Sequence, residues 1–213
     1  MVAMRIYCNY LCKLSIFLLL AAVFFLHGER TSASANDAMT QLQKSVDAIL
    51  VILQSEELKV SARKEERKQL VLELVNDMFD FQNMARSSLG QTWNTLTPEE
   101  QNRFVGLFKN LIEQRYIGKI DSFDNQKVVY HKQLVKGDRA MIYTDIVDKD
   151  LEVPIIYKLQ EIDGKWLIYD MKIENVSLIV NYRRDFESII RKEQFAGLVD
   201  KITQQIEKSE TPN

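Results

Sequence analysis

The sequence predicts a single α+β domain, with helices packed on one face of a four-stranded antiparallel sheet. Helical periodicity dominates the chain up to about residue 120, four strand-like segments follow between residues 127 and 173, and helical periodicity returns from residue 178. Helices, then a meander of strands, then helices are the order typical of the α+β class. The 178 residues that follow position 35 suffice for one domain with a sizeable core.

The first 35 residues have the pattern of a cleaved signal peptide. Arg5 and Lys13 precede an uncharged apolar run at 14–26, and an A-x-A cleavage pattern stands at 33–35. The run is short for a permanent membrane helix, although an uncleaved anchor is the alternative. We therefore expect residues 1–35 to be removed and residues 36–213 to form the mature domain.

Composition excludes several classes of function for the mature domain. Cys8 and Cys12 both fall inside the expected signal peptide, which leaves no disulfide, cysteine nucleophile or thiolate metal site. Removing residues 1–35 takes away three basic residues and one acidic residue, so the formal net charge changes from −2 to −4. This balance argues against a nucleic-acid partner and against electrostatic binding to anionic membranes.

Apolar residues at three- and four-residue steps predict the helices before the sheet. Such stripes run over 42–53 and 70–78, and a charged stretch at 56–69 joins them. Thr97-Pro98-Glu99-Glu100 is a helix start signal, with an N-cap hydroxyl, a first-turn proline and carboxylates at the positive end of the helix dipole. One apolar stripe follows it, made of Phe104, Leu107, Phe108, Leu111, Ile112, Tyr116 and Ile120.

Segments rich in Val, Ile and Tyr predict the four strands, at Lys127–Val135, Arg139–Val147, Val153–Gln160 and Lys165–Ile173. The turn residues Lys136-Gly137-Asp138 and Asp163-Gly164 indicate hairpins, the second of type I′. Short connections in series make the sheet a meander.

A helix is expected again at the end of the chain. Leu178, Tyr182, Phe186 and Ile190 are spaced by four, and the pattern continues over 195–206 after a possible break at Gly197. Arg183 and Arg184 fall on the flanking and outer faces of this helix. We expect these arginines on a solvated face, with a docking surface for a partner protein as the functional alternative.

The mature sequence offers little for catalysis. It has no G-x-S-x-G, no H-E-x-x-H and no glycine-rich phosphate loop. Its one histidine, His131, has no carboxylate or second histidine at ligand spacing, so we expect an ordinary strand histidine and no metal site. We expect no enzyme and no cofactor.

One enzymatic alternative stays open, in which an aspartate and a tyrosine share an apolar pocket for proton abstraction. Asp145 with Tyr143, or Asp170 with Tyr169, are the candidates, with His131 as a further acid–base group. We favour the interpretation that these are surface aspartates beside core tyrosines.

Apolar residues exceed what a plain scaffold needs. The helix stripe faces a strand whose Val153, Ile155, Tyr157 and Leu159 share one side, and Phe79, Phe81, Leu89 and Trp93 add to them. These residues form either an ordinary core or the wall of a ligand cavity, and composition does not decide between the two. A chaperone-like module with an exposed apolar groove is a third reading.

Two ordered motifs carry a resemblance, FDFQNMARSSLGQTWNTLTPEEQNRFVGLFKNLIEQRY at 79–116 and GKWLIYDMKIENVSLIVNYRRDF at 164–186. They resemble the MlaC family, the periplasmic phospholipid shuttles of Gram-negative bacteria, and the likeness extends over nearly all of the mature chain. Asn175 stands where the family usually has glycine, and Arg184 where it has a small polar residue. Asn tolerates a left-handed turn, so the corner at 175 can survive.

The resemblance implies a sheet wrapped by helices around a deep apolar pocket that buries the acyl chains of a phospholipid, the cargo, and leaves the headgroup outside. It implies a periplasmic monomer that exchanges lipid with an outer-membrane lipoprotein–porin complex and with an inner-membrane ABC transporter bearing MCE domains, and so maintains outer-membrane lipid asymmetry, in the retrograde direction as commonly taken. A hopanoid-related cargo is the alternative within the resemblance. The residues expected to line the pocket are Phe79, Phe81, Leu89, Trp93, Phe104, Leu107, Phe108, Leu111, Tyr116, Ile120, Val153, Ile155, Tyr157, Leu178, Tyr182 and Phe186.

Overall fold

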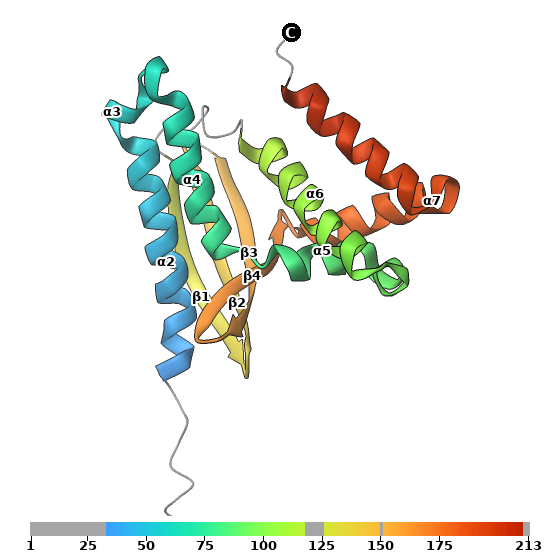
Figure 1. The fold of residues 1–213 in the computed structure, drawn as a ribbon. Coiled ribbons are helices and arrows are strands. Elements are labelled where there is room, and N and C mark those ends of the chain that lie inside the picture. Colours follow the sequence, from blue (N-terminus) through green and yellow to red (C-terminus); the bar gives the residue numbers. More distant parts are fainter. Residues whose placement is uncertain (1–32, 118–125, 150, 211–213) are drawn as a thin grey trace, which may run out of the picture. The chain divides into compact units, whose positions relative to one another are not determined.

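The structure is a computed structural model that describes residues 33–117, 126–149 and 151–210 (Figure 1). The chain divides into two units at residue 34, and the account below concerns the second unit, residues 35–213. The predicted signal peptide lies almost wholly outside the described residues and stays a prediction. The helical elements are α2 (Ala33–Gln54), α3 (Glu56–Lys59), η1 (Ser61–Arg63), α4 (Lys64–Met78), α5 (Phe81–Leu89), η2 (Gly90–Thr95), α6 (Pro98–Ile117) and α7 (Leu178–Glu210).

The α+β class is confirmed, but the predicted number of strands is wrong. The sheet has five antiparallel strands in the order β1-β2-β3-β4-β5. The additional strand β5 has two residues and pairs with the end of β4 through Lys172↔Ser177 and Ile173↔Val176. A strand of that length has no alternating pattern to detect, because period-two alternation needs at least four residues. The strands are β1 (Lys127–Lys136), β2 (Arg139–Asp148), β3 (Leu151–Ile162), β4 (Lys165–Ile173) and β5 (Val176–Ser177).

The local signals at the turns and at the start of α6 are confirmed. Asp163 and Gly164 both have positive φ, 50° and 79°, as a type I′ turn requires. Asn175 has φ 66°, so asparagine does adopt the left-handed conformation at the corner before β5. At the start of α6, the Thr97 N–H donates to Glu100 Oε2 at 2.8 Å and the Glu100 N–H donates to Thr97 Oγ1 at 3.2 Å. This reciprocal pair is a capping box.

Helix α7 bends, although not at the predicted residue. Gln194 has non-helical dihedrals, φ 62° and ψ −178°, so the bend lies three residues before Gly197. The glycine is needed beside the bend rather than at it, since a Cβ on Gly197 would lie 2.4 Å from the Cβ of Glu193. The close approach of these two backbones explains a glycine that the sequence pattern assigned to the break itself.

The described residues of the unit form two large buried clusters and a small one, which consists of Leu53 and Val71 between α2 and α4. One large cluster is made by the helices α5, α6 and α7 with η2, around Phe104, Phe108 and Phe186. The other large cluster lies between α2 and the sheet, around Leu42, Ile142 and Trp166. In Figure 1, α2 and α4 run side by side along the sheet, and α5, α6 and α7 form a separate helical layer.

Helix α2 is held across the sheet by polar contacts. The side chain of Gln41 donates to the Trp166 carbonyl at 2.8 Å and accepts from the Trp166 N–H at 3.1 Å. The Met39 N–H donates to Gln133 Oε1 on β1 at 3.1 Å. These bonds join the beginning of α2 to both β4 and β1. Among the described helices, none has the length and apolar character needed to cross a membrane.

Candidate ligand-binding site

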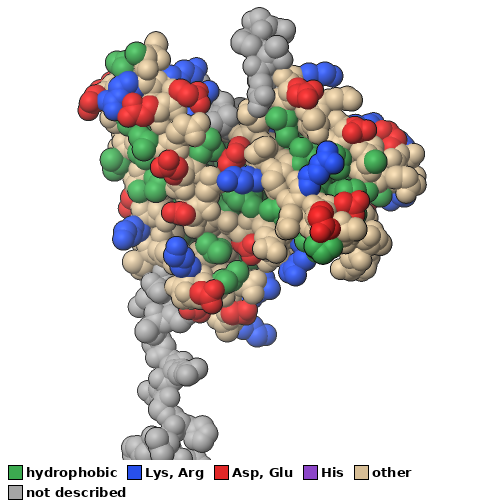
Figure 2. Space-filling view, viewed as in Figure 1, with side chains coloured by type: hydrophobic (Ala, Val, Ile, Leu, Met, Phe, Trp, Pro, Cys, Tyr) green, Lys and Arg blue, Asp and Glu red, His purple; other side chains and the backbone are tan. Residues whose placement is uncertain are grey.

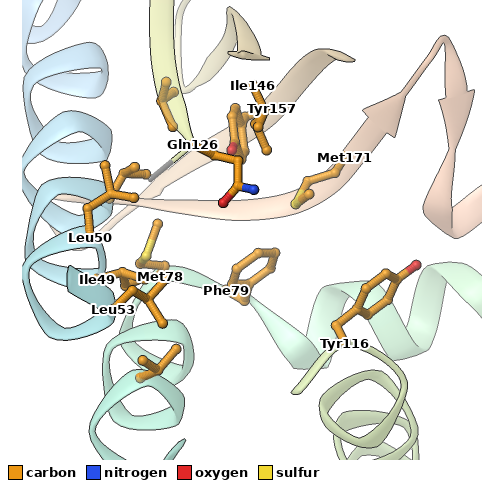
Figure 3. A pocket seen from close by; sticks show the side chains of 13 residues that line it. Ile49, Leu50, Leu53, Met78, Phe79, Tyr116, Gln126, Ile146, Tyr157 and Met171 are labelled. Atoms are coloured by element: carbon orange, nitrogen blue, oxygen red, sulfur yellow. The ribbon is translucent and has the colours of Figure 1, made fainter. Parts of the chain in front are cut away.

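The larger apolar cavity lies between α2, α4 and the sheet. Its volume is about 410 Å³, within the range typical of small-molecule sites. Side chains of α2, the end of α4, the end of α6 and the inner face of β1 to β4 point into it, as Figure 3 shows for ten of them. The lining residues are Val46, Ile49, Leu50, Leu53, Val71, Met78, Phe79, Tyr116, Gln126, Val128, Ile146, Tyr157 and Met171.

A second apolar cavity of about 250 Å³ adjoins the first, between α4, α6 and β4. Four residues line both cavities, namely Val71, Phe79, Tyr116 and Met171. Phe79 therefore stands on the boundary between the two, and Figure 3 shows its ring among the side chains that line the larger cavity. Figure 2 shows apolar side chains at the surface between α4 and α6, where the second cavity lies. The remaining lining residues are Leu72, Val75, Ile112, Glu113, Ile173 and Leu178.

The walls are almost free of charge. Among the described residues that line the larger cavity, none is charged, and its polar groups come from Gln126 and two tyrosines. The Gln126 amide donates to Asp148 Oδ2 at 2.9 Å, and burial raises the pKa of Tyr157 to about 12, so this hydroxyl stays neutral at physiological pH. The second cavity has one charged lining residue, Glu113, which pairs with Lys109 at 3.8 Å.

Four of the residues expected to line a pocket do line these cavities: Phe79, Tyr116, Tyr157 and Leu178. Most of the others pack in the helical cluster instead. There the ring of Phe108 meets Tyr182 and Phe186 edge-on, at 5.5 and 6.1 Å between centroids. The helical cluster contains Phe81, Leu89, Trp93, Phe104, Phe108, Leu111, Tyr182 and Phe186 as buried members and Leu107 as a partly buried one.

The other three expected lining residues lie elsewhere. Ile155 is buried in the cluster between α2 and the sheet, and Val153 is half-buried on β3. Ile120 lies outside the described residues. Contact of these residues, or of the helical cluster, with a ligand stays a prediction.

The sequence analysis missed the largest share of the wall, which comes from α2 and α4. Val46, Ile49, Leu50 and Leu53 belong to the first helix stripe, and Val71 and Met78 to the second. The stripes predicted these helices correctly, because period-3.6 apolar residues indicate a buried face. They do not indicate whether that face meets a sheet closely or leaves a cavity, since this depends on the distance at which the helix crosses the sheet.

Asp170 is buried, and the interpretation of a surface aspartate beside a core tyrosine is wrong here. Its side chain is the buried one, at 4 % relative exposure, whereas Tyr169 is half-buried. Asp170 accepts from Lys158 Nζ at 2.8 Å, from the Ser177 hydroxyl at 2.8 Å and from the Ile179 N–H at 3.2 Å. The carboxylate therefore fixes the start of α7 to β3 and β4. It lines neither cavity.

His131 also differs from the expectation of an isolated strand histidine. Its Nε2 contacts Asp145 Oδ2, and Glu152 completes a group whose ligand atoms lie within 4.8 Å of one another. Asp145 and Glu152 lie 14 and 21 positions after His131 in the chain, so spacing in the sequence could not reveal the group. Neither His131 nor Asp145 lines the two cavities.

The two arginines of the NYRRDF segment have different surroundings. Arg184 is exposed and donates to Asn181 Oδ1 at 2.9 Å, and its Nε lies 3.6 Å from Asp185 Oδ1, as expected for a solvated face. Arg183 is half-buried, and its Nε donates to the Ser87 carbonyl at 2.7 Å. It also packs beside Gly90, where a Cβ would lie 3.6 Å from the same nitrogen. Arg183 thus links α7 to α5, so the expectation that it lies on a solvated face is wrong.

Fold and cavity together define a class of protein: a small α+β domain that holds an apolar cavity between helices and one face of an antiparallel sheet. The family model described as MlaC protein matches residues 43–204. The chain belongs to the MlaC family.

Two known proteins illustrate the likeness. The chain is 23 % identical over 184 residues to the intermembrane phospholipid transport system binding protein MlaC of Haemophilus influenzae, covering 82 % of this chain and 85 % of that protein. Among solved structures, it resembles a phospholipid-binding protein from Ralstonia solanacearum in complex with a phospholipid. That match has a TM-score of 0.71 and 23 % identity, and it covers 82 % of this chain and 99 % of the other, which shows the fold.

Proposed function

We propose that this protein is a periplasmic phospholipid carrier that buries acyl chains in the cavity between α2, α4 and the sheet. The observation that carries the proposal is an apolar cavity of about 410 Å³ whose described lining residues include no charged side chain. Membership of the MlaC family supports it, as do the phospholipid transport named for the Haemophilus relative and the phospholipid bound to the Ralstonia protein.

The energetics of lipid extraction explain the composition of the wall. Each methylene that leaves water contributes about 0.8 kcal/mol. Burying two acyl chains in a membrane therefore lowers the free energy of the lipid by on the order of 20 kcal/mol relative to water. A carrier must offer a comparable apolar environment, or the lipid stays in the bilayer. A wall of aliphatic and aromatic groups does this without catalytic residues, and it discriminates weakly between headgroups.

The adjoining cavities suit a forked occupant. Phe79 lies on their boundary, and the second cavity carries its one charged lining residue, Glu113, beside Tyr116, which is 37 % exposed. In this proposal the acyl chains occupy the apolar interior, and the headgroup remains outside it. In this proposal the protein acts as a monomer. It exchanges lipid with two membrane complexes, an outer-membrane lipoprotein–porin complex and an inner-membrane ABC transporter with MCE domains.

The alternative of an acid–base enzyme is weakened by the positions of its candidate residues. His131, Asp145 and Asp170 line neither cavity, and Asp170 is fully used in fixing α7. A substrate held in the cavity would have none of these three groups beside it.

The test is to identify the molecule that copurifies with the protein. Native mass spectrometry after gentle purification, followed by organic extraction and lipid analysis, should recover a diacyl phospholipid at about one per chain. A protein that is folded by circular dichroism but empty would contradict the proposal. Recovery of a polycyclic hopanoid instead would support a lipid-carrier function but would show that the cargo is not a phospholipid.

A further inference from the structure

Three side chains with metal-binding groups meet on the sheet, away from the lipid cavity. His131, Asp145 and Glu152 come from β1, β2 and β3, and one ligand atom of each lies within 4.8 Å of the others. Ile146 lines the cavity from β2, so its neighbour Asp145 points to the opposite face of the sheet, and His131 and Glu152 meet Asp145 there. The group therefore occupies the opposite face of the sheet and has no part in the proposed lipid site.

The strand register brings the group together. In the pairing of β2 with β3, Asp145 stands opposite Pro154 and Val147 opposite Glu152, so both carboxylates lie on one face, one step apart. The pairing of β1 with β2 shifts between Tyr130 and Lys132, which leaves His131 as the additional residue of a β-bulge. Bulges turn a side chain out of the regular alternation and are frequent at functional sites.

Burial and charge suit a cation. The side chain of Asp145 is 13 % exposed and that of His131 is 47 % exposed, and Glu152 is exposed, so Asp145 anchors the group in the sheet and the other two members face solvent. Two carboxylates give the group two negative charges when the imidazole is neutral. Lys132, which follows His131 on β1, has its Nζ 4.7 Å from the centre of the Tyr143 ring.

The donor set indicates the class of ion. One imidazole nitrogen and two carboxylate oxygens match zinc and other first-row divalent ions, whereas calcium and magnesium prefer oxygen ligands alone. Three protein ligands from adjacent strands leave at least one position for water or for a group of a partner. Donors that project from strands of one sheet are held more rigidly than donors on loops.

We propose that His131, Asp145 and Glu152 form a binding site for a first-row divalent cation on the outer face of the sheet. The ion would join β1, which pairs with the sheet along one edge only, to β2 and β3. This site is independent of the proposed lipid carriage.

The test is a titration of purified, tag-free protein with zinc chloride against a chromophoric chelator at pH 7.5. We expect one zinc ion per chain and a rise of the thermal midpoint on its addition. Because affinity depends on each ligand, His131→Ala and Asp145→Asn should each weaken binding by at least about tenfold and abolish the thermal shift.

The matched control is Asp148→Asn, the same change on the same strand, where the carboxylate accepts from Gln126 on the cavity side. It should leave zinc binding unchanged. Absence of binding by the unaltered protein, or equal binding by His131→Ala, would overturn the proposal. So would equal affinity for calcium, because that ion does not need the imidazole. Circular dichroism of each variant checks that it is folded.

Discussion

Replacing Val128 by threonine should weaken lipid binding without disturbing the fold. Val128 lines the larger cavity from β1 and is half-buried. Threonine has nearly the same shape and is equally at home in a strand, so the change adds one hydroxyl to the cavity wall and little else. Val129, the next residue, is 42 % exposed and stands on the other face of the sheet, which makes Val129→Thr the matched control.

The size of the effect follows from desolvation of that hydroxyl. In the empty protein water can reach the new group, whereas in the complex acyl chains displace this water. Burying a hydroxyl without a partner costs about 1–3 kcal/mol in proteins. Since 1.4 kcal/mol is a factor of ten, the dissociation constant for the lipid should rise about 5- to 150-fold. For Val129→Thr it should change less than about twofold, because that hydroxyl stays in water.

The assay is a titration of delipidated protein with a fluorescent phospholipid, with thermal midpoints measured on the empty forms. Both variants should unfold within a few degrees of the parent protein. If Val128→Thr binds lipid like the parent, or if Val129→Thr is weakened equally, the acyl chains do not lie against the inner face of β1. The assignment of the cavity as the lipid site would then be wrong.

Three further outcomes are expected for the scaffold. Asp170→Asn should lower the free energy of unfolding in urea by about 2–3 kcal/mol, because it weakens charge-assisted hydrogen bonds at a buried position. The same change at the exposed Asp185 should alter the free energy of unfolding by no more than about 0.5 kcal/mol. Equal effects of the two changes would contradict the role of Asp170 in capping α7. Gly197→Ala should lower the free energy of unfolding by about 1–3 kcal/mol, because the new Cβ would lie too close to the Cβ of Glu193. Gly106→Ala, with open space around the residue, should raise it by about 0.5–1 kcal/mol. A Gly197→Ala protein as stable as the parent would mean that the helix shifts at the bend to make room. Burial raises the pKa of Tyr157 from about 10 to about 12, so the hydroxyl loses its proton at a higher pH in the folded state than in the unfolded state. The free energy of unfolding that this difference contributes is present below pH 10 and should be lost as the pH rises through 12. Unfolding curves at several pH values should therefore show a smaller loss of stability at high pH in Tyr157→Phe than in the parent protein.

Features fixed by near neighbours in the chain could be predicted from the sequence. The type I′ turn at Asp163 and Gly164, the capping box at Thr97 and the left-handed Asn175 each depend on a few consecutive residues. The class of fold follows from them, since turns at short intervals make a meander and a strong N-cap begins a helix. Strand β5 escaped because two residues carry no pattern.

The site depends on contacts between distant segments, and here the sequence was a weaker guide. Phe104 and Phe108 have the size and apolarity expected of a pocket wall, yet helix-on-helix packing buries them. Ile49 and Leu53 looked like ordinary stripe residues, yet they line the cavity because α2 crosses the sheet. Aliphatic side chains in a core and in a cavity wall have the same pattern, so the difference lies in the distance between elements.

The position of Phe79 has a consequence for how the protein deforms. Most domains of this size have one continuous core, whereas here the core is divided and Phe79 packs against both of its two larger clusters. Separating α4 from the sheet breaks the contacts of Phe79 and of Met78, the last residue of α4, with the cluster between α2 and the sheet, and leaves the buried members of the helical cluster in contact with one another. We therefore expect the domain to open at the end of α4 before the helical cluster is disturbed. If the protein carries lipid as proposed, a partner that separates α4 from the sheet would open the larger cavity and leave the packing of α5, α6 and α7 in place.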